Sequence, residues 1–153
     1  MAKQRITTGA ILEVNIEGQY YVYTQILGKA GYAFFDYKSK EKLEDLTVLL
    51  SARILFILSV YDDIITKGEW LKVGKLPIRS DLLVQPLQFI QDNLNPNNFE
   101  HYNPNTGEIT KATREECEGL ERAAVWEANH VEDRIRDYYL GVPNIWVEQL
   151  KIK

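Results

Sequence analysis

The chain has few of the residues that build covalent or metal-stabilised folds. Its 153 residues include one cysteine, Cys117, and two histidines, His101 and His130. A single cysteine cannot form an internal disulfide, and one cysteine with two histidines gives no recognisable zinc pattern. We therefore expect no disulfide framework, no structural metal and no cofactor.

Long apolar runs are also missing. The longest run near the middle, residues 54–58, reaches only Val60 even when Ser59 is included, whereas a membrane span needs about 20 apolar residues. Lys3 and Arg5 near the start are not followed by an apolar stretch, so no secretory signal is recognised. These features predict a cytoplasmic protein without a membrane partner.

Motifs of familiar enzymes are absent as well. The four serines lack the glycine-rich elbow that exposes a nucleophile. Gly28 and Gly31 enclose only two residues, and no helix is expected after them, so they do not form a phosphate-binding loop. We therefore expect no catalytic residue and no enzymatic activity.

The residues that are present predict one α+β domain over residues 1–153. At this length, 45% hydrophobic residues are enough for one core. Leu12, Val14 and Ile16 alternate with polar residues, as in a half-buried strand. Turn signals then separate residues 20–27 and 32–37, which completes a three-stranded meander.

Further strands are expected at residues 54–61 and 70–75, in a hairpin around residues 104–107, and at residues 145–152. Three prolines make residues 76–98 an irregular connection. Several short strands with regular turns favour a small, strongly curved, mainly antiparallel sheet or partial barrel. One long helix is expected to pack on this sheet.

That helix is predicted over residues 113–141. Thr113 and Glu116 form a capping box, and Gly141 with Pro143 supplies the end signal. Apolar residues recur at helical spacing and form a stripe against the sheet; they are Cys117, Leu120, Ala124, Val131, Ile135 and Tyr138.

The predicted helix carries the net charge of the chain. Residues 113–139 hold eight acids and four bases, and the whole chain also has a net charge of −4. Such a localised acidic face is suited to a basic protein partner. Residues 1–112 are nearly neutral, with 12 bases and 13 acids, so their aromatic strands lack the basic groove that single-stranded nucleic acid needs.

Glu127, His130 and Arg134 lie on one face of the predicted helix. A metal site in a helical protein needs a second Glu-x-x-His motif, and the chain has none. Two interpretations stay open: a structural network among the three side chains, or a role in binding a partner.

The chain resembles the bacterial immunity protein 26 family. The resemblance rests on short motifs in order along most of the chain, which are Gly9-Ala-Ile-Leu-Glu-Val, the strand at residues 20–27, Phe34-Phe35-Asp36, Trp70-x-x-Val-Gly74, Glu116-Cys117-x-Gly119-Leu120-Glu121-x-x-Ala124-x-Trp126 and His130-Val131-x-Asp133-Arg134-Ile135. The resemblance implies a protein that protects bacteria from a toxin of a polymorphic toxin system. It implies no catalytic residue.

Together these observations favour a cytosolic immunity protein that binds and neutralises a toxin, with a nuclease as the target class. The expected contact residues are Tyr23, Trp126, Glu127, His130, Asp133, Arg134 and Asp137. An enzyme-associated or small-molecule-binding domain, with a cleft near His130, is the alternative. A nucleic-acid-binding β-barrel is the third hypothesis, and the oligomeric state stays open.

Overall fold

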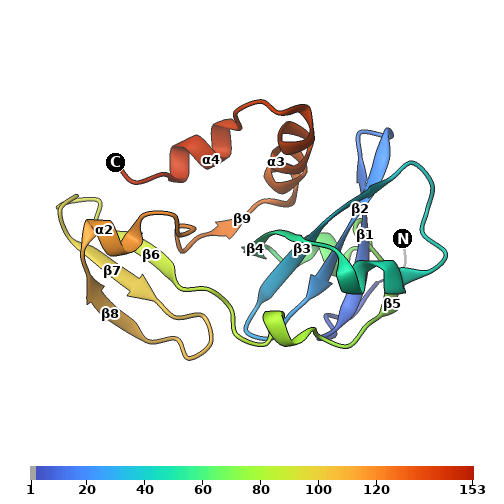
Figure 1. Cartoon of the computed structure of the whole chain (residues 1–153), viewed down its shortest axis with the longest axis horizontal. Coiled ribbons are helices and arrows are strands. Elements are labelled where there is room, and N and C mark those ends of the chain that lie inside the picture. The colour runs from blue at the N-terminus through green and yellow to red at the C-terminus, as the bar shows by residue number, and fades with distance from the viewer. Residues whose placement is uncertain (1–2) are drawn as a thin grey trace.

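The computed structural model describes residues 3–153 and confirms the α+β class (Figure 1). Its strands form a six-stranded sheet in the order β5-β1-β2-β3-β4-β9 and a three-stranded sheet in the order β6-β7-β8. The strands are β1 (Ala10–Ile16), β2 (Tyr20–Ile26), β3 (Gly31–Ser39), β4 (Ile54–Val60), β5 (Leu71–Lys75), β6 (Gln88–Gln91), β7 (Phe99–Tyr102), β8 (Ile109–Ala112) and β9 (Val125–Trp126). The helices are α1 (Asp63–Thr66), α2 (Arg114–Cys117), α3 (Ala128–Leu140) and α4 (Ile145–Leu150), and 3-10 turns cover Leu46–Ser51 and Ser80–Leu82.

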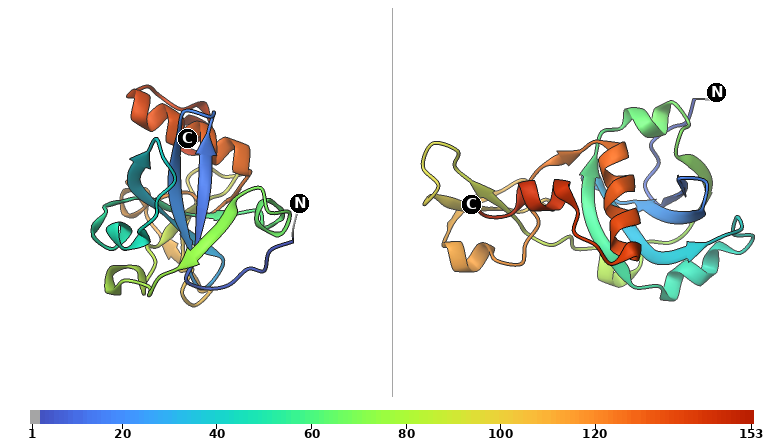
Figure 2. Two further views of the ribbon diagram at one scale, coloured as in Figure 1. Left: turned by 90° about the vertical axis from the view of Figure 1, so that its right-hand side faces the viewer. Right: turned by 90° about the horizontal axis from the view of Figure 1, so that it is seen from above.

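The two sheets lie at opposite ends of the long axis of the molecule (Figure 1). Helix α3 packs on the larger sheet, and α4 extends from it toward the smaller one, as the right-hand view shows (Figure 2). The larger sheet is open, with β5 and β9 at its edges. None of the helices in residues 3–153 has the length and apolar character needed to cross a membrane.

The predicted meander is confirmed. Strands β1, β2 and β3 pair antiparallel in sequence order, and β4 continues the sheet on the other side of β3. Gly18 takes a positive φ of 72° in the turn between β1 and β2, a conformation that glycine adopts without steric cost. Register shifts interrupt three of the ladders, and such bulges bend strands locally.

Both faces of the larger sheet are buried. On one face Val14 and Phe34 pack with Ile135 of α3. On the other face Tyr23 and Phe35 pack beneath the 3-10 turn at Leu46–Ser51. The alternation in β1 predicted a single buried face, so the second layer is a finding of the structure.

The second layer buries a carboxylate. Glu13 is only 6% exposed, and the Tyr23 hydroxyl donates to its Oε2 at 3.0 Å. The same hydroxyl accepts from the Leu43 amide at 2.9 Å, and Lys42 lies 3.5 Å from Glu13 Oε1. Burial is the main cause that raises the pKa of Tyr23, to about 12, so this phenol remains a donor at neutral pH.

The smaller sheet confirms the predicted hairpin. Strands β7 and β8 pair around a turn in which the Gly107 amide donates to the Asn103 carbonyl. Strand β6 pairs with β7, although the prolines predicted an irregular connection there. Phe89, Phe99 and Cys117 form the small core under this sheet.

The prediction of a single long helix over residues 113–141 is wrong, because the structure has two separate helices there. Its predicted start is correct, because Thr113 and Glu116 form both bonds of a capping box, but α2 ends after one turn. Gly119 then takes a φ of 82°, and the chain crosses between the sheets before α3 begins. The predicted end is also correct, since Gly141 closes α3 in the left-handed conformation. The two end signals therefore belong to two different helices.

The predicted strand at residues 145–152 is also wrong, because this segment contains helix α4. Asn144 caps it by accepting from the Val147 amide at 3.0 Å. Asparagine is a strong N-cap residue, since its side-chain oxygen replaces a missing helical acceptor. The cap at Asn144 thus favours a helix where a strand was expected.

We predict that Tyr23→Phe lowers the free energy of unfolding by about 1–3 kcal/mol, because the buried Glu13 carboxylate loses its donor. Chemical denaturation at neutral pH measures the loss. Tyr61→Phe is the control, since Tyr61 is 50% exposed and such surface changes stay within about 0.5 kcal/mol. Equal stability of Tyr23→Phe and the native chain would show that this bond contributes nothing.

We predict that Glu132→Gln stabilises the chain at pH 7. Glu132 Oε2 accepts from Trp70 Nε1 at 2.9 Å, and burial is the main cause that raises the pKa of this carboxyl. Between the unfolded and the folded pKa of Glu132, the folded chain holds a proton that the unfolded chain has lost, so ionisation of Glu132 costs stability as pH rises through its folded pKa. The glutamine removes this cost and keeps an acceptor for Trp70.

The advantage of Glu132→Gln over the native chain should shrink as pH falls toward the ordinary range of a glutamate. Urea denaturation of both proteins between pH 7 and pH 4 measures this difference directly. An advantage that is constant with pH, or a variant that is less stable at pH 7, would contradict the assignment.

Candidate binding surface

The predicted acidic face is divided among several elements. Glu115, Glu116 and Glu118 are exposed beside the smaller sheet, whereas Asp133 and Asp137 lie on α3 beside the larger one. The charge is local in sequence but not on one surface. The expectation of one continuous acidic face is therefore wrong.

Arginines neutralise much of this charge. Arg134 donates to both oxygens of Glu121 at 3.0 and 2.8 Å. Arg136 contacts Asp133 at 3.2 Å and Asp137 at 3.0 Å. Pairs of this kind are internal links, and they reduce the field that a partner would meet.

Arg134 is a structural clamp. Its guanidinium lies 4.0 Å from the centre of the Phe56 ring and 5.2 Å from that of Trp126, and its side chain is 14% exposed. This stacking and the double bond to Glu121 fix α3 against β4 and the crossing segment. Little of Arg134 remains for a partner.

The expected network of Glu127, His130 and Arg134 is not formed. Arg134 pairs with Glu121, while the His130 ring stacks on Trp146 with ring centres 3.6 Å apart. Glu127 is the exposed N-cap residue of α3 and makes no capping bond with its side chain. The helical spacing failed here because α3 begins only at Ala128.

Helix α4 is bonded to α3 through its first turn. Trp146 Nε1 donates to Asp133 Oδ2 at 3.0 Å, and Asn144 Nδ2 donates to Asp137 Oδ2 at 2.8 Å. Burial opposes ionisation of Asp137, but the bonds from Asn144 and Arg136 outweigh it and lower its pKa. Asp137 is thus a charged structural group, 8% exposed.

Tyr23 lies away from the other expected contact residues. It packs in the layer opposite α3 and has no exposed surface. It therefore cannot line a cleft near His130, where the small-molecule hypothesis places its site. Phe35 is buried in the same layer, so neither of these two rings is available to stack on a base.

Exposed apolar side chains are close in sequence where α3 ends and α4 begins. Within eight residues the chain exposes Tyr138, Leu140, Val142 and Ile145, each by about half or more. The sequence could have indicated this exposure, because the four residues flank Gly141, which ends the helix. The predicted apolar stripe instead assigned Tyr138 to the core. We call these four residues the α3–α4 patch.

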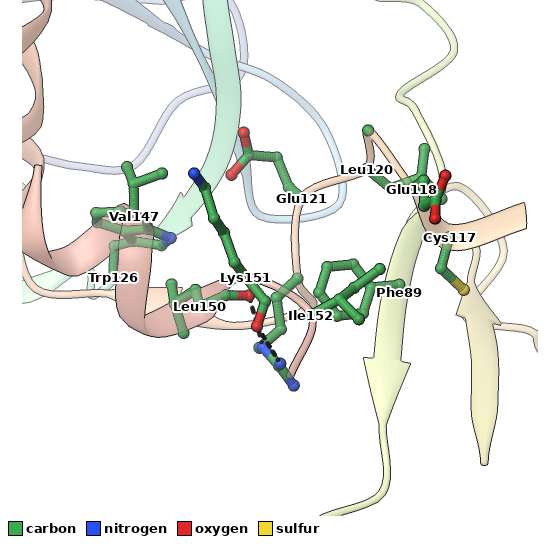
Figure 3. A pocket seen from close by; sticks show the side chains of 12 residues that line it. Phe89, Cys117, Glu118, Leu120, Glu121, Trp126, Val147, Leu150, Lys151 and Ile152 are labelled. Carbon is green, nitrogen blue, oxygen red and sulfur yellow. Dashed lines mark hydrogen bonds between the residues drawn. The ribbon is translucent and has the colours of Figure 1, made fainter. Parts of the chain in front are cut away.

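A hollow of about 390 Å³ lies between the two sheets. Trp126 forms one side, Phe89, Cys117 and Leu120 form the other, and Val147, Leu150 and Ile152 border it from the C-terminal segment (Figure 3). A second hollow of about 330 Å³ is bordered by residues 119–121, by β4 and by the segment before β6. His130 borders neither of them.

Metal-binding groups are not brought together in the part of the chain that the structure describes. No three His, Cys, Asp or Glu side chains from residues 3–153 cluster in a way that could hold an ion. Burial raises the pKa of the Cys117 thiol, and this thiol faces the Glu100 carbonyl at 3.9 Å. A buried thiol of raised pKa is a poor nucleophile.

Comparison with known proteins identifies the family of the chain. No curated protein and no solved structure is significantly similar to it. The family model described as Immunity protein 26 matches residues 7–100, which is more than half of the chain and includes β1 to β6. The resemblance noted in the sequence is thereby confirmed over β1 to β6, while its motifs at residues 116–135 lie beyond the match. The chain belongs to the immunity protein 26 family.

Proposed function

We propose that this protein neutralises a toxin by binding it directly, without chemistry of its own. Membership of the immunity protein 26 family carries the proposal. A cytoplasmic location belongs to the same proposal. We also propose a nuclease as the target, because a chain with a net charge of −4 is attracted to the basic surface with which a nuclease binds phosphates. We also propose that residues 1–153 act as one unit.

The α3–α4 patch is the proposed centre of the contact. Leu140 is 66% exposed and Ile145 is 61% exposed, and monomeric proteins seldom gather apolar side chains on the surface without a use. Tyr138 adds an aromatic ring, the type of residue that most often dominates binding energy. The rigid network between α3 and α4 holds these side chains in place.

The outer side of α3 is the proposed rim of the contact. Its 13 residues span about 20 Å at 1.5 Å per residue. Glu127, His130 and Asp133 are retained there from the expected contact residues. Tyr23, Trp126, Arg134 and Asp137 are withdrawn, because their side chains are mostly buried.

We predict that Leu140→Asp and Ile145→Asp each weaken binding of the cognate toxin about 30-fold, the effect of losing about 2 kcal/mol at a binding hot spot. The probe is the toxin encoded beside this gene. Calorimetric titration gives the affinity, and growth of cells that express both proteins gives the protection. Both should fail together in these variants.

Leu94→Asp is the matched control, because Leu94 is 97% exposed and lies outside the patch. It should bind and protect like the native chain. Equal loss in all three variants would locate the contact elsewhere. A native chain that neither binds nor protects would refute the proposed function itself.

We predict that Glu127→Lys slows association with the same toxin and makes it less sensitive to salt, because an exposed rim charge acts mainly on the association rate. Stopped-flow measurements at two salt concentrations test this. Glu108→Lys, at the exposed turn of the hairpin, is the control with the same charge change. Identical rates in both variants would remove Glu127 from the contact.

A further inference from the structure

The hollow between the sheets has the properties of a small-molecule site. Its volume of about 390 Å³ is within the usual range for such sites, about 300–1,000 Å³. Most of its lining is apolar, with Phe89, Leu120 and Leu150 among its walls. Small-molecule sites commonly combine walls of this kind with a few polar groups.

Three of the four charged side chains that line the hollow already have partners, and the fourth, Glu118, is exposed to solvent. Arg122 donates to the carbonyls of Leu150 at 2.9 Å and Lys151 at 3.1 Å, and to Gln91 Oε1 at 3.2 Å. Glu121 is held by Arg134, and Lys151 Nζ donates to Glu148 at 2.9 Å. An ionic ligand would have to break these pairs, so the hollow favours a neutral one.

One buried donor beside the hollow is unused. Trp126 is 4% exposed, and within residues 3–153 its Nε1 is the one buried side-chain polar atom that lacks a hydrogen-bond partner. Figure 3 shows this nitrogen on the edge of the indole turned toward the middle of the hollow. A buried donor without an acceptor destabilises the folded chain, and an acceptor on a ligand would recover this cost.

The other two tryptophans show what is missing. Trp70 Nε1 donates to Glu132 at 2.9 Å, and Trp146 Nε1 donates to Asp133 at 3.0 Å. The fold thus supplies a carboxylate acceptor to each indole except Trp126. The difference is confined to the one tryptophan that lines the hollow.

We propose that this hollow binds a neutral small molecule with an apolar body and one hydrogen-bond acceptor, which accepts from Trp126 Nε1. Ketones, esters and amides have this chemistry. Because the nitrogen itself is sealed, the ligand enters by displacing a neighbouring side chain of the C-terminal segment, such as Leu150 or Val147. The site does not depend on the α3–α4 patch or on toxin binding.

The test uses two probes of similar shape, cyclohexanone and methylcyclohexane, which differ in the carbonyl acceptor. The protein is labelled with nitrogen-15, and the three indole N–H signals are followed by nuclear magnetic resonance during titration. The Trp126 signal should move saturably with cyclohexanone. The Trp70 and Trp146 signals, whose donors are occupied, are internal controls and should move little.

Cyclohexanone should bind about tenfold more tightly than methylcyclohexane, a ratio that corresponds to about 1.4 kcal/mol. In Trp126→Phe, which also assigns the signal, this ratio should fall to about one because the ring remains and the donor is lost. Equal affinity of the two probes for the native chain would overturn the proposal. So would a Trp126 signal that stays still, or that moves no more than the two controls.

Discussion

The arrangement of the two sheets depends on two neighbouring side chains that bond in different directions. Glu121 accepts two hydrogen bonds from Arg134 of α3, which rests on Phe56 of the larger sheet. Arg122 lies over Phe89 of the smaller sheet and donates to the carbonyls of the C-terminal segment. One crossing segment therefore fixes α3 on one side and the smaller sheet on the other, and the hollow lies between them.

Local signals in the sequence predicted what local physics decides. The meander, the hairpin around Gly107 and the helix end at Gly141 depend on turn residues and on short-range bonding, and the structure contains all three. The long helix failed because residues 118–126 make contacts distant in sequence instead. The Phe89 amide donates to the Glu121 carbonyl, and the Ala123 amide donates to the Phe89 carbonyl. The residue pattern of this segment does not indicate that its backbone bonds to Phe89, about 30 residues earlier.

The candidate site was harder to predict than the fold, because its properties depend on pairing. Counting charges located the net charge, but it could not show that Arg134 and Arg136 neutralise Glu121, Asp133 and Asp137. Tyr23 illustrates the same limit, since an aromatic residue in a strand can lie on either face and here lies in the buried second layer. The Trp126 indole N–H is notable because it has no hydrogen-bond partner. The sequence cannot show this, because it depends on how distant segments pack around the ring.

The family match adds a further division within the chain. It covers residues 7–100 and so describes the scaffold of the larger sheet, whereas the α3–α4 patch and most of the hollow are built from residues beyond it. Helix α4 shapes both surfaces: Trp146 supports the α3 side through His130 and Asp133, while Val147 and Leu150 border the hollow. Its six residues are too few to be a stable helix alone. Its position is therefore set by the Asn144 cap and by Arg122, so the same polar contacts that order the C-terminal segment determine the shape of both surfaces.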